Sequence, residues 1–84
     1  MFLVYAISSL TRNYIYVGLS SDIERRISDH NNGYNKTTKP YKPFKTILLE
    51  EYPTRTEARH REKYLKSGVG KAYLKKLLSN DNVF

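Results

Sequence analysis

A continuous apolar stretch near the start of the chain constrains the fold more than any other feature. Residues 2–7 read FLVYAI, a run of strand length without the polar alternation of a strand that has one face in water. We therefore expect a strand that is buried on both faces and central in its sheet. The chain has 84 residues, which leaves room for one domain over residues 1–84 and for a small core.

Two more strands and three helices follow from the spacing of the apolar residues. β-branched and aromatic residues mark the strands, and i, i+3, i+4 spacing marks the helices. The expected fold is an α/β (α+β) sandwich in the order β-β-α-β-α-α, with a small three-stranded, mainly antiparallel sheet flanked by helices. The further elements are expected as strands over 14–18 and 46–52, and as helices over 22–31, from Thr54 to about Lys66, and over 71–79.

Capping residues indicate where two of the helices begin. Ser21 is followed three positions later by Glu24, and Thr54 is followed in the same way by Glu57. Both pairs are typical of a capping box at a helix N-terminus. Gly33 stands where a glycine commonly ends a helix. We therefore expect Ser21 to cap the first helix and Gly33 to end it.

The balance of charged residues indicates a polyanionic partner. Fifteen lysines and arginines against eight acidic residues give a net charge of +7 and a pI near 9.7. Nucleic acid is the leading interpretation, and a basic surface that serves solubility is the alternative. There is no cysteine, no signal peptide and no apolar run of bilayer length, so we expect a soluble, cytoplasmic protein without disulfides or a zinc ribbon.

The segment KTTKPYKPFK, residues 36–45, carries a lysine at every third position together with two prolines. Prolines disfavour a helix, so we expect an extended basic loop. Its lysines are suited to contacts with the DNA backbone, and a solvated lysine loop is the alternative. The last predicted helix would extend this surface. The candidate nucleic-acid-binding residues are Lys36, Lys39, Tyr41, Lys42, Lys45, Lys71, Lys75 and Lys76.

Three polar side chains stand at helix positions that normally face a core. Arg26 and His30 share one face of the first predicted helix with two isoleucines. Glu62 lies on the apolar stripe of the second. A buried unpaired charge is costly, so an ion pair between Arg26 and Glu62 is one interpretation. A functional site is the other, because buried ion pairs stabilise poorly in comparison with apolar packing.

Tyrosines from the first two strands lie close to these side chains in the predicted fold. Tyr5 belongs to the central strand, and Tyr16 stands two positions before Gly18, which permits close approach of a ligand. We expect a tyrosine, the arginine, the histidine and the glutamate to converge at one end of the sheet. Hydrolysis of a phosphodiester needs an activated water, a cation for the charge on the phosphate and usually a metal held by carboxylate. This set can supply those groups.

The same residues resemble the motifs of the GIY-YIG nuclease domain. Val4-Tyr5-Ala6 occupies the place of the first motif and Tyr16-Val17-Gly18 that of the second. Arg26 and His30 follow at the family's spacing, and Arg61-Glu62-Lys63 resembles the segment around the family's metal-binding glutamate. The resemblance covers nearly the whole chain. It includes a likeness to small stand-alone bacterial members, which are often labelled as related to the excision-repair incision subunit.

The resemblance implies a metal-dependent endonuclease that hydrolyses DNA phosphodiester bonds in repair or recombination. It implies that Glu62 binds one Mg²⁺ or Mn²⁺ ion and that Arg26 stabilises the charge on the phosphate. It also implies that either Tyr16 or Tyr5 accepts the proton of the attacking water, and that His30 hydrogen-bonds a tyrosine or takes up a proton. The alternative is a nucleic-acid-binding module on the same fold that is catalytically weak or inactive.

Three departures from the family pattern bear on activity. The first motif lacks the leading glycine, and Leu19-Ser20 stand where some members have a lysine or threonine. Leu74 falls near the place where many members carry an asparagine. These departures concern supporting roles and keep the binding-module alternative open. The sequence does not distinguish flap, branched and plain duplex DNA as substrates. It also leaves open whether a partner protein directs the domain to its target.

Overall fold

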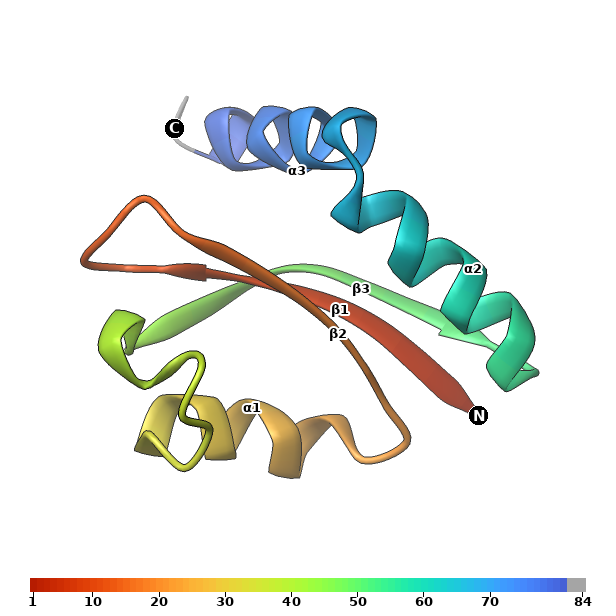
Figure 1. Ribbon diagram of the computed structural model, residues 1–84, viewed down its shortest axis with the longest axis horizontal. Helices are drawn as coiled ribbons and strands as arrows, with labels where there is room; N and C mark the ends of the chain where they lie inside the picture. The colour runs from red at the N-terminus through yellow and green to blue at the C-terminus, as the bar shows by residue number, and fades with distance from the viewer. Residues whose placement is uncertain (82–84) are drawn as a thin grey trace.

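The computed structural model describes residues 1–81 and has a three-stranded sheet with helices on both faces (Figure 1). The order β-β-α-β-α-α and the α+β class are confirmed. Among residues 1–81, no helix is long and apolar enough to cross a membrane. The elements are β1 (Phe2–Ser9), β2 (Ile15–Ser20), α1 (Ile23–Asn32), the 3₁₀ helix η1 (Lys39–Tyr41), β3 (Phe44–Tyr52), α2 (Arg55–Lys66) and α3 (Gly68–Asp81).

The apolar stretch at the start of the chain forms the central strand, as predicted. The sheet order is β2-β1-β3, and β1 pairs with both neighbours in antiparallel fashion. Tyr5 stands opposite Gly18 of β2 and opposite Leu49 of β3. The four residues from Val4 to Ile7 are at most 1% exposed. Burial on both faces therefore accounts for the absence of polar alternation in this strand.

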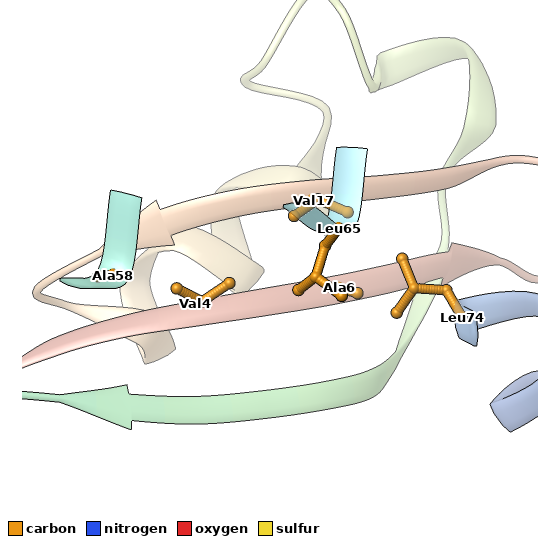
Figure 2. Close-up of a cluster of buried hydrophobic side chains, with 6 residues drawn as sticks. All are labelled: Val4, Ala6, Val17, Ala58, Leu65 and Leu74. Carbon is orange, nitrogen blue, oxygen red and sulfur yellow. The ribbon is translucent and has the colours of Figure 1, made fainter. Parts of the chain in front are cut away.

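The two faces of the sheet have different cores. Val4, Ala6 and Val17 face α2 and α3 and pack against Ala58, Leu65 and Leu74 (Figure 2). The alternate residues of β1 point to the opposite face, which α1 and η1 cover (Figure 1). There Tyr5 and Ile7 form a second cluster with Phe44. One face is thus aliphatic and the other is largely aromatic.

The helix ends follow local capping, with one correction at the start of α1. The predicted cap Ser21 is wrong, because Asp22 is the N-cap and its carboxylate accepts a 3.3 Å hydrogen bond from the amide of Arg25. Gly33 ends α1 in the left-handed conformation at φ 77°, as predicted. Thr54 caps α2 as predicted, and its hydroxyl accepts a hydrogen bond from the amide of Glu57.

The last helix begins three residues earlier than predicted. α3 starts at Gly68 because the hydroxyl of Ser67 accepts a 3.3 Å hydrogen bond from the amide of Gly70. The first turn of α3 also passes very close to the end of α2. A Cβ atom on Gly70 would lie 2.4 Å from the Cα atom of Leu65, so this contact requires glycine.

The basic segment is not extended throughout, which corrects the sequence prediction. Lys39–Tyr41 form the short helix η1 with Pro40 in its first turn. A proline is tolerated there because the first amides of a helix have no partner within the helix. The segment is also held at its far end, where the side chain of Asn31 accepts a 2.7 Å hydrogen bond from the amide of Phe44. It therefore has a defined shape against α1.

Candidate active site

A buried chain of hydrogen bonds lies between β1 and α1. The hydroxyl of Tyr5 is 2.9 Å from Nε2 of His30, and Nδ1 of His30 is 2.7 Å from the hydroxyl of Thr38. Tyr5 is 1% exposed, and His30 and Thr38 are fully buried. His30 thus occupies a core-facing position of α1 because two hydroxyl groups satisfy its ring nitrogens. Thr38 was not among the residues singled out in the sequence.

Gly18 makes room for this arrangement. A Cβ atom on Gly18 would lie 2.5 Å from both Cζ and Oη of Tyr5, which is far inside contact distance. The ring of Tyr5 therefore crosses β2 at the one residue without a side chain. The sequence suggested that Gly18 permits close approach of a ligand, and here the group that approaches is the ring of Tyr5.

Tyr16 completes an aromatic group around His30. Its ring centroid is 4.8 Å from that of His30 and 6.2 Å from that of Tyr5. Tyr16 is half-buried, whereas Tyr5 is closed off from solvent. Of the two tyrosines that the sequence singled out for catalysis, Tyr16 is therefore the more exposed.

Both hydrogen-bonded partners are neutral at pH 7. Burial raises the pKa of Tyr5 above the ordinary value for tyrosine, and the neighbouring Tyr16 adds to this effect, while the charge of Arg26 opposes it. Burial also lowers the pKa of His30, and the charge of Arg26 lowers it further. Tyr5 thus keeps its proton, and His30 has one ring nitrogen free to accept a proton.

Arg26 lies at the edge of this site and not in the core, which corrects the sequence interpretation. Its side chain is exposed, although its charge reaches both Tyr5 and His30. Arg26 and Arg55 line a hollow of about 220 Å³. The hydroxyl-bearing residues Ser20 and Ser21 line it as well. On its other side Arg26 shares a hollow of about 280 Å³ with acidic neighbours in and before α1.

Arg55 is a residue that the sequence reasoning missed. It is the first residue of α2, directly after the cap Thr54, and it reaches the same hollow as Arg26 of α1. Two guanidinium groups with nearby hydroxyls suit a phosphate group. A basic residue directly after a helix cap was the only signal in the sequence, and nothing local indicated that it would meet Arg26.

Glu62 belongs to α2 and lies on the side of the sheet opposite α1. It is 7% exposed and lies 3.6 Å from Arg59 and 3.3 Å from Lys66. The ion pair with Arg26, which was one of the two interpretations of the sequence, is therefore wrong. The charge of Glu62 nevertheless acts on Tyr5 and contributes to its raised pKa. The structure therefore brings Tyr5, Tyr16 and His30 into direct contact and leaves Arg26 and Glu62 at the margins.

A metal ion at Glu62 would depend on water and substrate for most of its ligands. Residues 1–81 contain no group of three His, Cys, Asp or Glu side chains that could hold a metal ion. The cations beside Glu62 are its own neighbours on α2, and both are about half exposed. They can therefore move away from the carboxylate. A single carboxylate of this kind fits Mg²⁺ or Mn²⁺, since Mg²⁺ is commonly held by one or two carboxylates with waters and phosphate oxygens.

The candidate DNA-binding lysines form two sets on opposite sides of the sheet. Lys36, Lys39 and Lys42 are exposed on the α1 side, whereas Lys45 is half-buried and lines a hollow with Leu78 of α3. On the α3 side, a groove of about 500 Å³ runs along β2. Its basic lining residues are Lys66, Lys71 and Lys75.

Tyr14 connects the two lysine sets. It lines the groove beside α3, and its ring stacks on that of Tyr41 with centroids 3.9 Å apart. The guanidinium group of Arg12 lies 5.8 Å from the Tyr41 ring. The ring of Tyr41 is therefore in contact with other side chains of the protein. The edge strand β2 runs between the two sets of lysines.

Comparison with known proteins identifies the family. The GIY-YIG catalytic domain matches residues 1–76 of the chain. The chain belongs to the GIY-YIG family. This confirms the resemblance drawn from the two tyrosine motifs, and the family implies an endonuclease-type function. Leu74, which stands near the place of an asparagine in many GIY-YIG domains, is fully buried in the aliphatic core.

Relatives of this GIY-YIG chain include UPF0213 proteins. SSP2268 of Staphylococcus saprophyticus is 41% identical over 54 residues, which span 63% of this chain and 66% of that protein. CPE1444 of Clostridium perfringens is 38% identical over 53 residues, which span 62% and 57%. The matched stretch thus spans about two thirds or less of these two relatives. SERP0126 of Staphylococcus epidermidis is 36% identical over 62 residues, which span 73% of this chain and 76% of that protein.

A solved structure resembles this GIY-YIG fold. The solution NMR structure of the UPF0213 protein BH0048 from Bacillus halodurans aligns with a TM-score of 0.55 and 30% identity. The alignment covers 92% of this chain and 85% of that chain. The fold, a sheet with helices on both faces, is therefore similar to that of a relative with a solved structure.

Proposed function

We propose that this GIY-YIG domain is a metal-dependent endonuclease that hydrolyses phosphodiester bonds in DNA, with repair or recombination as its setting. The observation that carries the proposal is the buried pair of Tyr5 and His30 beside the accessible Tyr16. A tyrosine with a raised pKa is a poor proton acceptor by itself. It can act as one when a neighbouring base takes its own proton.

The hydrogen bond from Tyr5 to His30 supplies that route. The proposed step requires a water to reach the hydroxyl of Tyr5, a residue that is 1% exposed, past the half-buried Tyr16. That water gives a proton to the Tyr5 oxygen while Tyr5 gives its proton to Nε2 of His30, 2.9 Å away. The water oxygen forms a bond to phosphorus, and the bond from phosphorus to the leaving oxygen breaks. The leaving oxygen takes a proton from solvent, and His30 returns its proton to solvent through Tyr5. We assign to the half-buried Tyr16 the contact that orients the water or the phosphate.

The phosphate charge is met by cations from two helices. Arg26 and Arg55 line one hollow, so both can contact oxygens of the same or neighbouring phosphates. Mg²⁺ or Mn²⁺ bound by Glu62 would neutralise further charge on the phosphate. The lysines on both sides of β2 would hold the DNA backbone along this edge of the sheet.

Cleavage assays test the enzymatic proposal. Purified protein is incubated with labelled linear, flap and four-way DNA in Mg²⁺, Mn²⁺ or EDTA. We expect metal-dependent cleavage that Glu62→Gln abolishes and that Tyr5→Phe reduces by about 100- to 10,000-fold, the range typical of a lost proton acceptor. Tyr64→Phe changes an exposed tyrosine of α2 and is the matched control. Equal cleavage by wild type and Glu62→Gln would mean either that a contaminant does the cutting or that Glu62 is not part of the site.

The same assay distinguishes the role of Tyr5 from that of Tyr16. Loss of cleavage in Tyr16→Phe with full cleavage in Tyr5→Phe would move the proton acceptor from Tyr5 to Tyr16. Loss in Tyr5→Phe with a smaller effect of Tyr16→Phe supports the assignment made above.

A second candidate function is a nucleic-acid-binding module without catalysis. Two observations favour it: Leu74 is buried where many members carry a polar residue, and Glu62 is paired with two cations of its own helix. Under this reading no substrate is cut under any metal condition, while binding of DNA persists.

Salt dependence tests DNA contact under either reading. We expect binding to weaken steeply as salt rises, because each phosphate contact contributes about 0.9 to the slope of log K against log salt. Lys39→Ala combined with Lys42→Ala should lower affinity and reduce this slope. Lys63→Ala, which removes an exposed charge from α2, is the control. An unchanged slope in the double variant would show that this loop is only solvated.

A further inference from the structure

Thr38 lies directly behind His30 and has no role in the chemistry described so far. It is fully buried, and its hydroxyl is 2.7 Å from Nδ1 of His30. We propose that Thr38 is a positioning residue that holds the proton of neutral His30 on Nδ1, so that Nε2 is free to accept the proton of Tyr5. The catalytic consequence rests on the proposed function, whereas the position of the proton on the ring does not.

Counting donors and acceptors gives the direction of each hydrogen bond. The Thr38 hydroxyl carries one hydrogen, and the carbonyl oxygen of Asn35 accepts it at 3.4 Å. We infer that the ring donates the 2.7 Å bond between Nδ1 of His30 and this hydroxyl, because the hydroxyl hydrogen has the Asn35 carbonyl as an acceptor. A neutral imidazole with its hydrogen on Nδ1 has a lone pair on Nε2. The hydroxyl of Tyr5 is therefore the donor in its bond to Nε2.

The other tautomer leaves the hydroxyl hydrogen of the buried Tyr5 without a partner. With the hydrogen on Nε2, His30 would donate to Tyr5 and the Thr38 hydroxyl would have to donate to Nδ1. The hydrogen of the Tyr5 hydroxyl would then have no acceptor among the described residues. The carbonyl of Asn35 would keep the amides of Thr38 and Lys39 as donors, at 3.2 and 2.9 Å. Buried polar groups without partners are costly. The network as a whole therefore selects the Nδ1–H form.

The position of Thr38 is itself held by the fold. Its amide donates to the carbonyl of Asn35 at 3.2 Å, and its carbonyl accepts from the amide of Tyr41 at 2.9 Å. Thr38 thus stands at the start of η1. The ring of His30 is in turn enclosed by Tyr16 and by Phe44, whose centroid is 6.0 Å away. Neither partner of this hydrogen bond can turn freely.

The arrangement serves the proposed proton transfer. The bond from Nδ1–H to Thr38 exists before the transfer and persists when Nε2 gains the proton of Tyr5, so no group has to reorient. In the other tautomer Nε2 already carries a hydrogen and cannot accept one. Loss of the Thr38 hydroxyl should therefore lower the rate of the chemical step and leave DNA affinity unchanged.

NMR of the histidine rings tests where the proton of His30 lies, whether or not the protein cuts DNA. Long-range ¹H–¹⁵N spectra of ¹⁵N-histidine-labelled wild type near neutral pH should show His30 protonated on Nδ1, with exposed His60 as the internal reference. A wild-type His30 protonated on Nε2 would overturn the proposal, whatever any variant does. Thr38→Val should move the ring towards the Nε2–H form or a mixture of forms.

Activity assays add the catalytic consequence. We expect Thr38→Val to slow cleavage by about 10- to 100-fold, as is typical when the partner that orients a functional histidine is removed. Thr38→Ser keeps the hydroxyl and should restore both the tautomer and the rate. Thr37→Val alters the exposed neighbour and should change neither. An Nδ1–H ring and a full rate in Thr38→Val would overturn the proposal. An Nδ1–H ring in a wild type that cuts no DNA would refute the proposed function and keep the assignment of the tautomer.

Discussion

The two faces of the sheet are built from alternate residues of the same strand but from different chemistry. Val4 and Ala6 join an aliphatic cluster under α2 and α3, whereas Tyr5 joins an aromatic group with a buried histidine under α1 (Figures 1 and 2). The cluster of the first face is apolar, and the mostly buried carboxylate of Glu62 lies on that face as well. On the second, the interior is held by specific hydrogen bonds. The buried pair of Tyr5 and the histidine lies on the second face, whereas Glu62 and Arg55 belong to α2 on the first, so the candidate site draws on both faces.

Charges are also arranged differently on the two sides. On the α2 side they pair at the rim, where Arg61 makes two hydrogen bonds of 2.8 and 3.1 Å to Glu50 and lies close to the rings of Tyr64 and Tyr73. On the α1 side the buried pair of Tyr5 and His30 is neutral. A neutral pair avoids the cost of desolvating a charge and is able to exchange a proton.

The largest effect on stability is expected on the aliphatic face. Leu65→Ala removes a fully buried side chain and should lower the free energy of unfolding by about 2–5 kcal/mol. Urea denaturation measures this change. Leu49→Ala, at a leucine that is 52% exposed, is the control and should cost less than about 1 kcal/mol. Similar losses in the two variants would contradict the view that the α2 face carries the main core.

A smaller loss of stability with a larger loss of function is expected on the aromatic face. Gly18→Ala places a methyl group 2.5 Å from the Tyr5 ring, so Tyr5 has to move away from His30. Overpacking of this kind costs about 1–3 kcal/mol, and cleavage should fall as far as in Tyr5→Phe. Denaturation and cleavage assays are run together.

Gly68 provides the matched control for this experiment, because nothing lies within 4 Å of a Cβ atom there. Gly68→Ala should leave cleavage unchanged. Full activity in Gly18→Ala would show that the contact between Tyr5 and His30 is not needed for function.

The smallest effect is expected at the charged rim. Burial by itself would raise the pKa of Glu50, but the hydrogen bonds from Arg61 and Tyr52 outweigh it and hold the pKa below its usual value. A carboxylate with a lowered pKa in the folded state adds stability above its unfolded pKa, and this contribution is lost as pH falls through the folded pKa. Both partners are about a quarter exposed, so we expect only about 1 kcal/mol.

Urea denaturation from pH 7 to pH 3 checks this sign. The difference in stability between wild type and Glu50→Gln should be present at pH 7 and should shrink in the acidic range below about 4.5, the ordinary value for glutamate. Glu51→Gln alters the exposed neighbour on β3 and serves as the control. A difference that grows as pH falls would contradict the assigned direction of the pKa shift.

Much of the fold could be predicted because its determinants are local in the sequence. The unbroken apolar run of residues 2–7 indicated a central strand, and Gly33 and Thr54 marked helix ends through contacts within a few residues. Where local signals competed, the prediction failed. Both Ser21 and Asp22 can cap a helix, and only the backbone path out of β2 selects Asp22.

The candidate site was predictable in its residue types and less so in its contacts. Tyr5, Tyr16 and His30 were found through the order and spacing of their motifs, and the structure brings them together. Arg26 was expected inside and lies in the open, because helical periodicity gives the direction of a side chain but not where the covering layer ends.

The sequence by itself determined the central strand, the order of the elements and the family, because apolar period, capping and motif spacing are properties of neighbouring residues. Only the tertiary structure decided that Thr38 would contact His30, that Arg55 would line the same hollow as Arg26 and that Glu62 would pair within its own helix. These choices depend on how a loop and two helices pack around the sheet. A hydrogen bond or an ion pair forms with whichever group packing brings within about 3 Å, and a linear pattern carries no record of that distance.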